Sequence, residues 1–346
     1  MKQATIIGAT GFGGLGLIDI LMRHPGFSIK QLIARKDVNI PISDIFPHLR
    51  GICDLNVDPA ENINYETDIV FFSTPDRTGM QIINEYHKRG IPVIDFSGDF
   101  RFKSTEDYAV YAKNRGLEET HLAANLLSQS VYGLPEKNRD AIKDAKLVGN
   151  PGCFAITMIL GLLPAIEAGI IESNTIICDG KSGVSGAGKN SGEANLYPQR
   201  YENVNTYREG RHQHLVEVEN IINSSGGNKN IFFVPQVVPM TRGILVNMYA
   251  DLKKDIDTKK LQSIYHDYYA NEPFVIITDR SPNTSDVKGS NRCEIRPMAD
   301  TRTGKILITS VTDNLMKGQS GNAIQLANIM MGFEETTALD AAAFYP

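Results

Sequence analysis

Several features that define whole classes of proteins are missing from this sequence of 346 residues. Basic residues are not in excess, because 35 Lys and Arg stand against 40 Asp and Glu and give a formal net charge of −5. This balance argues against a nucleic-acid-binding surface and against a polybasic membrane anchor. No stretch reaches the roughly 18 uninterrupted apolar residues that a membrane-spanning helix needs. The longest candidate, residues 156–171, is interrupted by Pro164 and Glu167.

Cysteine is scarce and scattered along the chain. The N-terminal residues contain one lysine and a short apolar run that meets glycines, without the cleavage pattern of a signal peptide. The length predicts about two domains with cores large enough to need no disulfides. We therefore expect a globular protein of the reducing cytoplasm, because its cysteines form no closely spaced pairs. They are Cys53, Cys153, Cys178 and Cys293.

A glycine-rich turn follows the first apolar run of the chain. Residues 4–7 are typical of a buried parallel strand, and apolar residues at helical spacing begin at Leu15. Backbone N–H groups in such a turn, together with the helix N-terminus, favour binding of a pyrophosphate. The spacing is Gly-x-x-Gly-x-x-Gly rather than the commoner Gly-x-Gly-x-x-Gly, so an ordinary glycine turn is the alternative. The residues expected to bind a dinucleotide are Gly8, Thr10, Gly11, Phe12, Gly13 and Gly14.

The second predicted strand, residues 27–34, ends in Arg35 and Lys36. Arg35 follows Gly14 by 21 residues, near the place where NAD-specific proteins carry an acidic residue for the ribose 2′-hydroxyl. Two cations suit a 2′-phosphate instead, which favours NADP, and an exposed Arg-Lys pair without a ligand is the alternative.

Further buried strands at residues 68–72 and 92–96, with a helical pattern at 79–88 between them, predict a doubly wound sheet. Ligands of such sheets bind beyond the carboxyl ends of the strands. We therefore expect the residues that follow the first of these strands to border the cofactor, although ordinary strand-end turns are an alternative. These residues are Ser73, Thr74 and Pro75.

Cys153 lies in a tight turn between a predicted strand at residues 146–149 and an apolar helical pattern at 154–168. At a helix N-terminus the dipole and the unsatisfied backbone N–H groups favour the thiolate over the thiol. The sequence therefore predicts a nucleophilic cysteine at this turn. The other three cysteines are expected to be small buried hydrophobic residues.

An acid–base partner for this cysteine is expected in the segment around His212 and His214. Apolar residues at 215, 218 and 222 predict a helix that begins near His214, and this helix places His214 and Glu217 on one face. The carboxylate can then orient an imidazole or raise its pKa. Metal ligation by the histidines is an alternative that no further His or Cys cluster supports. Exposed surface residues are the other alternative.

The second half of the chain is rich in predicted strands. A loop of small residues at 179–189 carries two lysines, so it suits a phosphate or a carboxylate as well as a flexible surface. Long strands with few helices between them indicate an antiparallel sheet in an α+β domain. A polar turn leads to a final apolar helix at 323–331, which has a face to pack on the first domain. The predicted strands are residues 231–234, 244–252, 274–277, 293–297 and 306–311.

Eight short motifs stand out along the chain: Gly8-x-x-Gly11-x-x-Gly14, Pro47-His48-Leu49-Arg50-Gly51, Asp95-Phe96-Ser97-Gly98-Asp99-Phe100-Arg101, Tyr132-Gly133-Leu134-Pro135-Glu136, Asn150-Pro151-Gly152-Cys153, Lys181-Ser182-Gly183-Val184-Ser185-Gly186-Ala187-Gly188, Val238-Pro239-Met240-x-Arg242-Gly243 and Gly289-Ser290-Asn291. As a set, and in this order, they resemble the N-acetyl-gamma-glutamyl-phosphate reductase family over most of the chain. Any one of them alone is a weak signal.

The resemblance implies a cytoplasmic NADP(H)-dependent oxidoreductase of arginine biosynthesis, which reduces a small-molecule acyl phosphate to a semialdehyde through a thioester on Cys153. It implies an α/β Rossmann dinucleotide-binding domain, residues 1–149 completed by 315–346. It also implies an α+β substrate and dimerisation domain with a mostly antiparallel sheet, residues 150–314, and a homodimer or homotetramer.

Residue by residue, Cys153 matches the family's nucleophile, and His212, His214 and Glu217 match its His-x-His followed by an acidic residue. This chain has Leu215-Val216 where the family usually has one residue and then proline, so the histidine that faces the sulfur stays open. By the same resemblance, Asn314, Lys317 and Gly318 are expected on the cofactor side, and Arg101, Asn150, Ser182 and Gly183 in the substrate site.

Two alternatives to this function remain at this point. One is a related acyl-phosphate reductase, which acts on an aspartyl phosphate or on an aminoadipyl phosphate held by a carrier protein. The Asn-Pro-Gly-Cys setting of Cys153 argues against the aspartyl enzyme. The other alternative is a non-catalytic dinucleotide sensor on the same scaffold, which has no need for a thiolate at Cys153.

Overall fold

The computed structural model describes residues 1–189, 192–253 and 256–345, and the chain forms two compact units. The expected division of the chain differs from these units at residues 111–117, at 315–318 and after 340, which all belong to unit 2, and at 150–151, which belong to unit 1. Unit 1 comprises Met1–Val110, Glu118–Pro151 and Gln319–Asp340, and unit 2 comprises Tyr111–Leu117, Gly152–Gly318 and Ala341–Pro346.

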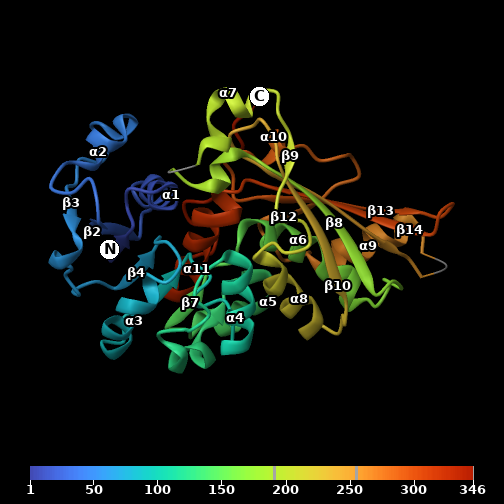
Figure 1. Cartoon of the computed structure of the whole chain (residues 1–346), viewed down its shortest axis with the longest axis horizontal. Helices are drawn as coiled ribbons and strands as arrows, with labels where there is room; N and C mark the ends of the chain where they lie inside the picture. The colour runs from blue at the N-terminus through green and yellow to red at the C-terminus, as the bar shows by residue number, and fades with distance from the viewer. Residues whose placement is uncertain (190–191, 254–255, 346) are drawn as a thin grey trace. The chain divides into compact units, whose positions relative to one another are not determined.

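Unit 1 is built on a parallel sheet with the strand order β3-β2-β1-β4-β5-β7-β6 (Figure 1). Its strands are short and apolar, and residues such as Ile6, Phe71 and Ile94 are fully buried, as expected for a sheet that is covered on both faces. The strands are β1 (Lys2–Ile7), β2 (Phe27–Ala34), β3 (Val57–Pro59), β4 (Ile69–Phe72), β5 (Val93–Asp95), β6 (Val131–Tyr132) and β7 (Leu147–Gly149).

The helices of unit 1 alternate with these strands. In α3, Met80, Ile83 and Tyr86 recur at helical spacing and are buried. The last helix, α11, packs against α1, α5 and β5, which confirms that the final apolar helix returns to the first domain. The helices are α1 (Phe12–Leu21), α2 (Ile42–Ile45), α3 (Gly79–Lys88), α5 (Pro135–Lys143) and α11 (Gly321–Met331), with 3-10 turns at Pro47–Leu49, Ala60–Asn62 and Ala124–Gln129. Helix α4 (Thr105–Arg115) begins in unit 1 and ends in unit 2.

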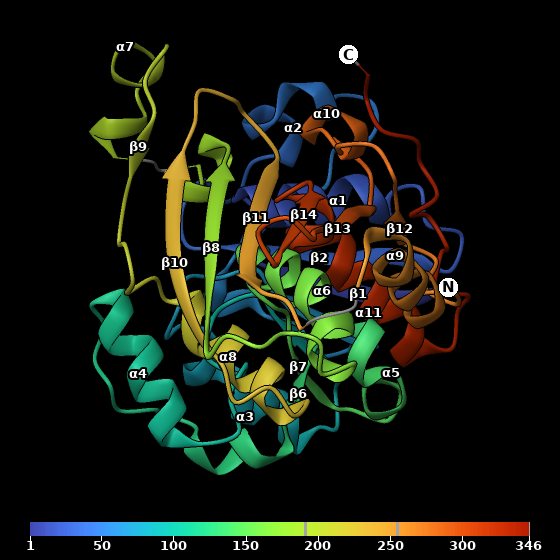
Figure 2. The ribbon, with the colours of Figure 1, turned by 90° about the vertical axis from the view of Figure 1, so that its right-hand side faces the viewer.

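Unit 2 contains a mixed sheet with the order β12-β13-β14-β11-β8-β10-β9. The pairs β8–β10 and β12–β13 are parallel, and the other neighbours are antiparallel. Figure 2 shows β10, β8 and β11 side by side. The strands are β8 (Thr175–Ser182), β9 (Asn205–Thr206), β10 (Asn230–Val237), β11 (Ile244–Asp251), β12 (Val275–Ile277), β13 (Cys293–Asp300) and β14 (Lys305–Thr312).

One helix of unit 2 is apolar all round. In α6 (Cys153–Glu167) the residues from Phe154 to Ile166 are buried, and the helix packs on β11, β14 and α8. Helices α6 and α9 pack against the sheet, whereas alternate residues of β8 and β10 on its other face stay exposed. The remaining elements are α7 (Tyr197–Arg200), α8 (His214–Ser224), α9 (Thr258–Tyr268), α10 (Thr284–Val287), 3-10 turns at Val184–Ala187 and Glu193–Asn195, and a π-helical turn at Met316–Ser320.

These two units confirm the predicted fold class, an α/β unit with a parallel sheet and an α+β unit with a mostly antiparallel sheet. The first sheet has a strand order typical of dinucleotide-binding folds. Strands β2 and β3 extend the sheet on one side of β1, and the later strands extend it on the other side. Among the described residues, no helix combines the length and the apolar character that crossing a bilayer requires.

Candidate active site

The glycine turn of unit 1 follows β1, as predicted, and two of its glycines cannot be replaced without distortion. Gly8 has a φ of +91°, and a Cβ there would lie 2.2 Å from the carbonyl oxygen of Ser73. A Cβ on Gly14 would lie 2.5 Å from the oxygen of Gly8, so only glycine lets α1 pack this close to the turn. The result is a backbone cradle at a helix N-terminus, which suits a pyrophosphate.

The residues of unit 1 that are predicted to surround a bound cofactor lie at the carboxyl edge of the parallel sheet. The Ser73 N–H donates to the carbonyl of Ile7 at 2.8 Å, which fixes the end of β4 beside the turn. The Gly8 N–H donates to Ile33, and the exposed Arg35 follows two residues later. Thr10, Gly11, Phe12 and Thr74 are half-buried, Gly13 is buried, and Lys36 and Pro75 are exposed.

The second turn of interest is the one that carries Cys153. Cys153 is the first residue of α6, and Gly152 is its N-cap. The α6 N-cap makes no side-chain hydrogen bond, so the first N–H groups of the helix have no partner within it. A partly exposed sulfur at this position is stabilised as a thiolate by the helix dipole. None of the four cysteines is in a disulfide, and the other three are buried, as predicted.

His214 lies directly against this turn. A Cβ on Gly152 would lie 2.3 Å from His214 Nε2, so the imidazole occupies the space that any other residue at 152 would need. His214 is the first residue of α8, where the sequence predicted the helix to begin. Glu217, one turn further along, is buried, and its Oε2 accepts a hydrogen bond from the Gly152 N–H at 2.9 Å. Glu217 therefore holds the backbone next to Cys153, and the His214 ring lies against it.

His212 is held as a neutral imidazole. Burial, followed by the charges of Arg208 and Arg115, lowers the pKa of His212 to about 3. Its Nδ1 accepts a hydrogen bond from the His214 N–H at 3.2 Å, so its proton is on Nε2. Its ring packs edge-on against His214, with 4.7 Å between the centroids. His212 thus cannot accept a proton near neutral pH. Its contacts fix the position of the His214 ring, which lies against Gly152.

Tyr207 and Gly318 lie near the sulfur of Cys153. The sequence predicted no role for Tyr207 and a place on the cofactor side for Gly318. Burial raises the pKa of Tyr207, and the charge of Cys153 raises it further, so its phenol stays protonated close to the sulfur. A Cβ on Gly318 would lie 2.8 Å from the Cβ of Cys153, which makes glycine necessary there. Tyr207 was missed because an aromatic residue without a motif carries no signal by itself.

Two residues expected on the cofactor side are buried inside unit 2. Asn314 Oδ1 accepts from the Gly243 N–H at 2.8 Å, and its Nδ2 donates to Ser185 Oγ at 2.9 Å. The side chain of Lys317 is fully buried, with its ammonium 5.9 Å from the ring centroid of Phe274. Both side chains therefore serve the packing of the loops that surround them.

The small-residue loop after β8 is anchored by its backbone. The Gly183 N–H donates to the carbonyl of Gly243 at 2.9 Å, and a Cβ on Gly183 would lie 2.7 Å from the oxygen of Thr241. Ser182 is buried, and its Oγ donates to the Gly183 carbonyl at 3.1 Å. The loop therefore has a fixed shape at its start, which is what a binding loop requires.

Arg101 and Asn150, the other residues predicted to bind substrate, lie in unit 1. The Arg101 guanidinium donates to the carbonyls of Asn150 at 2.8 Å and Phe96 at 2.6 Å. The Asn150 side chain is buried and bonds to Asn322 and to the carbonyl of Gln319. Asn150 therefore orients the chain three residues before Cys153, and Arg101 holds the same segment.

A buried carboxyl pair supports the Arg101 segment. Asp95 ends β5 and accepts from the hydroxyl of Ser97 at 2.6 Å, and Asp99 accepts twice from the N–H of Arg77. Burial raises the pKa of both carboxyl groups, and their mutual repulsion raises that of Asp95 further. These aspartates were visible in a motif, but only the structure shows that they are buried.

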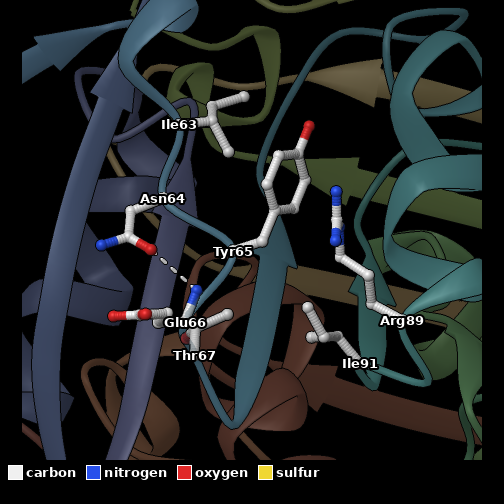
Figure 3. A pocket seen from close by; sticks show the side chains of 7 residues that line it. All are labelled: Ile63, Asn64, Tyr65, Glu66, Thr67, Arg89 and Ile91. Carbon is white, nitrogen blue, oxygen red and sulfur yellow. Dashed lines mark hydrogen bonds between the residues drawn. The ribbon is translucent and has the colours of Figure 1, made fainter.

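A hollow of about 680 Å³ lies elsewhere in unit 1, lined by Ile63, Asn64, Tyr65, Glu66, Thr67, Arg89 and Ile91 (Figure 3). The Arg89 guanidinium stacks on the ring of Tyr65 at 4.5 Å from its centroid. These residues precede β4 and β5, whereas ligands of doubly wound sheets bind where the strands end. The hollow is therefore distinct from the glycine turn. Within residues 1–189, 192–253 and 256–345, no group of three or more His, Cys, Asp or Glu could hold a metal ion.

Comparison with known proteins defines the class. The family model for the semialdehyde dehydrogenase NAD binding domain matches residues 3–145, and that for the semialdehyde dehydrogenase dimerisation domain matches residues 153–314. Two solved structures share the fold: aspartate semialdehyde dehydrogenase II from Vibrio cholerae (TM-score 0.72, 18% identity, 96% of this chain and 99% of that one) and aspartate semialdehyde dehydrogenase with NADP from Candida albicans (TM-score 0.72, 15% identity, 96% and 98%).

Two curated relatives are far more similar in sequence, and both cover the whole chain. N-acetyl-gamma-glutamyl-phosphate reductase of Bacillus cereus (strain AH187) is 40% identical over 350 residues, and that of Thermoanaerobacter pseudethanolicus is 42% identical over 352 residues, with 100% of both chains covered in each case. The chain therefore belongs to the N-acetyl-gamma-glutamyl-phosphate reductase family.

Proposed function

We propose that the chain catalyses the NADPH-dependent reduction of N-acetyl-gamma-glutamyl phosphate to the semialdehyde, with release of phosphate, as a step of arginine biosynthesis in the cytoplasm. The observation that carries the proposal is the position of Cys153 at the start of α6, with His214 packed against the preceding glycine. The names of relatives that are about 40% identical over the full length supply the substrate.

The glycine turn of unit 1 fits the dinucleotide. A Cβ at Gly8 or Gly14 would collide with neighbouring carbonyl oxygens, so both positions require glycine. The turn therefore presents backbone without side chains where a pyrophosphate would bind at the helix N-terminus. Arg35 and Lys36 follow β2 at the same edge and supply positive charge for a 2′-phosphate. Ser73, Thr74 and Pro75 border the turn from the end of β4. When bound, NADPH supplies the hydride that reduces the acyl carbon.

The chemistry begins at the sulfur. The Cys153 thiolate attacks the acyl-phosphate carbonyl, a carbon–sulfur bond forms, and the carbon–oxygen bond to phosphate breaks, which leaves a thioester. Backbone N–H groups in the first turn of α6 point toward the N-terminal end of that helix and stabilise the oxyanion of each tetrahedral species. Gly152 is excluded from this role, because its N–H is used by Glu217.

We assign the acid–base role to His214. His212 stays neutral and its Nδ1 is engaged by the His214 N–H, so it serves to orient His214. His214 gives a proton to the oxyanion that forms when the acyl carbon is reduced, which yields the thiohemiacetal. It takes this proton back as the carbon–sulfur bond breaks, the Cys153 thiolate is restored and the semialdehyde leaves. Ser182 and Gly183 of unit 2 contribute to anion binding, and Arg101 contributes to anion binding in unit 1. Asn150, Glu217 and Asn314 position the backbone.

The test is the reverse reaction, in which N-acetylglutamate semialdehyde, NADP⁺ and phosphate yield NADPH, which is followed by its absorbance. We expect turnover with this semialdehyde and none without phosphate. A faster reaction with aspartate semialdehyde or with a carrier-bound aminoadipate semialdehyde would replace the proposed substrate. If NADP⁺ binds but none of the three semialdehydes is turned over, the result favours the non-catalytic dinucleotide sensor.

We also infer that unit 2 forms the contact of a homodimer or homotetramer. The matching family model is described as a dimerisation domain, and the outer sheet face carries an exposed apolar row. Ile177 of β8 pairs directly with Phe232 of β10 and with Tyr249 of β11, and all three are exposed. We expect Phe232→Asp to dissociate the assembly in sedimentation experiments, whereas Ile52→Asp, an equally exposed change in unit 1, leaves it intact.

A further inference from the structure

The residues that follow Asp340 belong to unit 2, although Gln319–Asp340 belongs to unit 1. Phe344 attaches this returning segment, because its N–H donates to the carbonyl of Lys288 at 2.8 Å. Its ring lies on the next residue, Gly289, where a Cβ would be 2.3 Å from Phe344 Cδ2. Gly289 is buried, whereas Phe344 itself is 65% exposed. The ring therefore covers Gly289 but adds little to the hydrophobic core.

Gly289 is bonded to a buried carboxylate. Asp313 is fully buried, and its Oδ2 accepts a hydrogen bond from the Gly289 N–H at 2.6 Å. The Arg242 guanidinium lies 3.0 Å from the same oxygen and balances its charge. Gly289 has a φ of +78°, a conformation that favours glycine. Since a buried carboxylate that loses a donor is destabilised, the position of Gly289 helps to fix that of the Asp313 side chain.

The same aspartate holds the turn that lies against Cys153. Its Oδ1 accepts from the Leu315 N–H at 2.8 Å, and its carbonyl oxygen accepts from the Gly318 N–H at 2.9 Å. Gly318 is part of the π-helical turn Met316–Ser320, a type of turn that is frequent at functional sites. A Cβ on Gly318 would lie 2.8 Å from the Cβ of Cys153. Asp313 therefore connects Gly289 with the backbone that packs on Cys153.

We propose that Phe344 and Asp313 are positioning residues for Cys153. The Phe344 ring keeps Gly289 on the Asp313 carboxylate, and Asp313 keeps Gly318 against Cys153; we call Phe344, Gly289 and Asp313 the clamp. The expected effect on turnover rests on the proposed function, because that function makes Cys153 the nucleophile. All of these residues belong to unit 2. The ring acts through the contacts between them, so its loss should shift Cys153 without removing a group that reacts.

Phe344→Ala tests the clamp in the reverse reaction. We expect kcat to fall about 10-fold, because a displacement of about 1 Å can cost about 100-fold and this shift is smaller. The KM values for semialdehyde and phosphate should stay within about threefold of the wild type. Phe344→Leu, which keeps an apolar cover on Gly289, should lie between the two. Tyr345→Ala, at the neighbouring and 77% exposed residue, is the matched control and should behave as the wild type.

Alkylation by iodoacetamide gives a second readout, which needs no substrate. It reports on Cys153, because this sulfur is partly exposed and the other three are buried. A shifted Cys153 loses part of the thiolate stabilisation that the N-terminus of α6 provides, so the pH midpoint of alkylation should rise by about half a unit in Phe344→Ala. The melting temperature should change by less than about 2 °C, because Phe344 is mostly exposed.

Gly289→Ala provides an independent arm. Its Cβ would displace the Phe344 ring, so this variant should reproduce both effects of Phe344→Ala, and the double variant should be no worse than either single one. Gly304→Ala is its control, because Gly304 also has a positive φ, +66°, but no described atom lies within 4 Å of its Cβ. This control carries the backbone strain without displacing a ring, so it should keep the wild-type kcat and alkylation midpoint.

The outcomes separate the clamp from the proposed function. A wild type that does not turn over N-acetylglutamate semialdehyde contradicts the proposed function, and the alkylation measurements then still test the clamp. Three results overturn the clamp: a wild-type alkylation midpoint in Phe344→Ala, losses in Tyr345→Ala or Gly304→Ala as large as those in the clamp variants, or a double variant in which the two losses multiply.

Discussion

Two turns in this molecule connect a parallel strand to a helix N-terminus. They differ in whether the anion at that N-terminus is a bound ligand or a side chain of the protein itself. After β1, the turn of unit 1 is bare backbone, because Cβ atoms at Gly8 and Gly14 would collide with neighbouring carbonyls. After β7, the turn ends in Cys153, whose own side chain supplies the anion in the proposed function. The helix N-terminus provides the same field in both places. The residue placed in it decides whether the protein binds an anion or generates one.

The second turn also needs its glycine for a different reason. Gly8 and Gly14 are required by the backbone around them, whereas Gly152 is required because the His214 ring occupies the adjacent space. One turn is shaped by main-chain packing, and the other is shaped by the His214 side chain, to which we assign the acid–base role. Substitutions should therefore separate the two turns into cofactor binding and chemistry.

The largest effect is expected for Cys153→Ala. Without the sulfur no thioester can form, so kcat should fall by about 10⁴-fold or more, whereas the dissociation constant of NADPH should change by less than about threefold. Rapid-quench kinetics and fluorescence titration measure the two quantities. Cys53→Ala, at a buried cysteine of unit 1, is the control and should keep full activity. Substantial turnover by Cys153→Ala would exclude covalent catalysis.

In the first turn, Gly14→Ala and Gly11→Ala should differ. A Cβ at Gly14 clashes at 2.5 Å, so we expect the free energy of unfolding to drop by about 1–3 kcal/mol and NADPH binding to weaken about 100-fold. A Cβ at Gly11 meets its nearest atom at 3.6 Å, so stability should be unchanged and only NADPH binding should weaken, by about 10-fold. Thermal melts and calorimetric titration compare them. Equal loss of stability in both variants would contradict the assignment of Gly11 to the cofactor.

Arg35→Ala should change the choice of cofactor by a smaller factor. Removing a cation from the 2′-phosphate should reduce the preference for NADPH over NADH by about 10-fold, measured as the ratio of the two kcat/KM values. Lys30→Ala, at an exposed lysine on the same strand, should leave the ratio unchanged. If the wild type uses both cofactors equally well, Arg35 has no role in selecting between them.

The smallest effect concerns the neutral His212. Its folded pKa of about 3 lies below the unfolded value of 6.5, so unfolding takes up a proton between these two pH values. The stabilisation present above pH 6.5 is therefore lost as the pH falls, by about 2 kcal/mol between pH 7 and pH 5. Urea unfolding should show this loss in the wild type and a shallower one in His212→Asn. Parallel curves would mean that His212 is not held neutral.

Much of the fold could be predicted from local patterns. The strand at residues 27–34 and the helix at 79–88 have the predicted ends. The strand ends in the apolar run Leu32–Ala34, and buried residues recur at helical spacing in the helix. The start of α6 at Cys153 and of α8 at His214 followed from the turn and from apolar spacing. The parallel pairing of β8 with β10 could not be predicted, since strand direction depends on the long connection and not on the strands themselves.

The site was predictable only in part, and the reason is burial. Cys153 and His214 lie at helix starts, which leave a signal in the sequence. Asn314 and Lys317 look like exposed polar residues in a polar turn, and only their packing against other loops buries them. For Tyr207 and Arg208 the relevant property is a neighbour far away in sequence, Cys153 or Arg115, which no local pattern contains.

The burial of three of the four sulfurs has a consequence for oxidative stress. Peroxide reacts with thiolates that it can reach, and Cys53, Cys178 and Cys293 are enclosed, with burial raising the pKa of Cys53 and Cys178. Damage should therefore fall on Cys153 alone and begin as a sulfenic acid. Since the other three thiols are buried and cannot form a disulfide with Cys153, reduction of its sulfenic acid would depend on small reductants such as glutathione. Oxidation of Cys153 to the sulfenic acid would then be reversible without new synthesis of the protein.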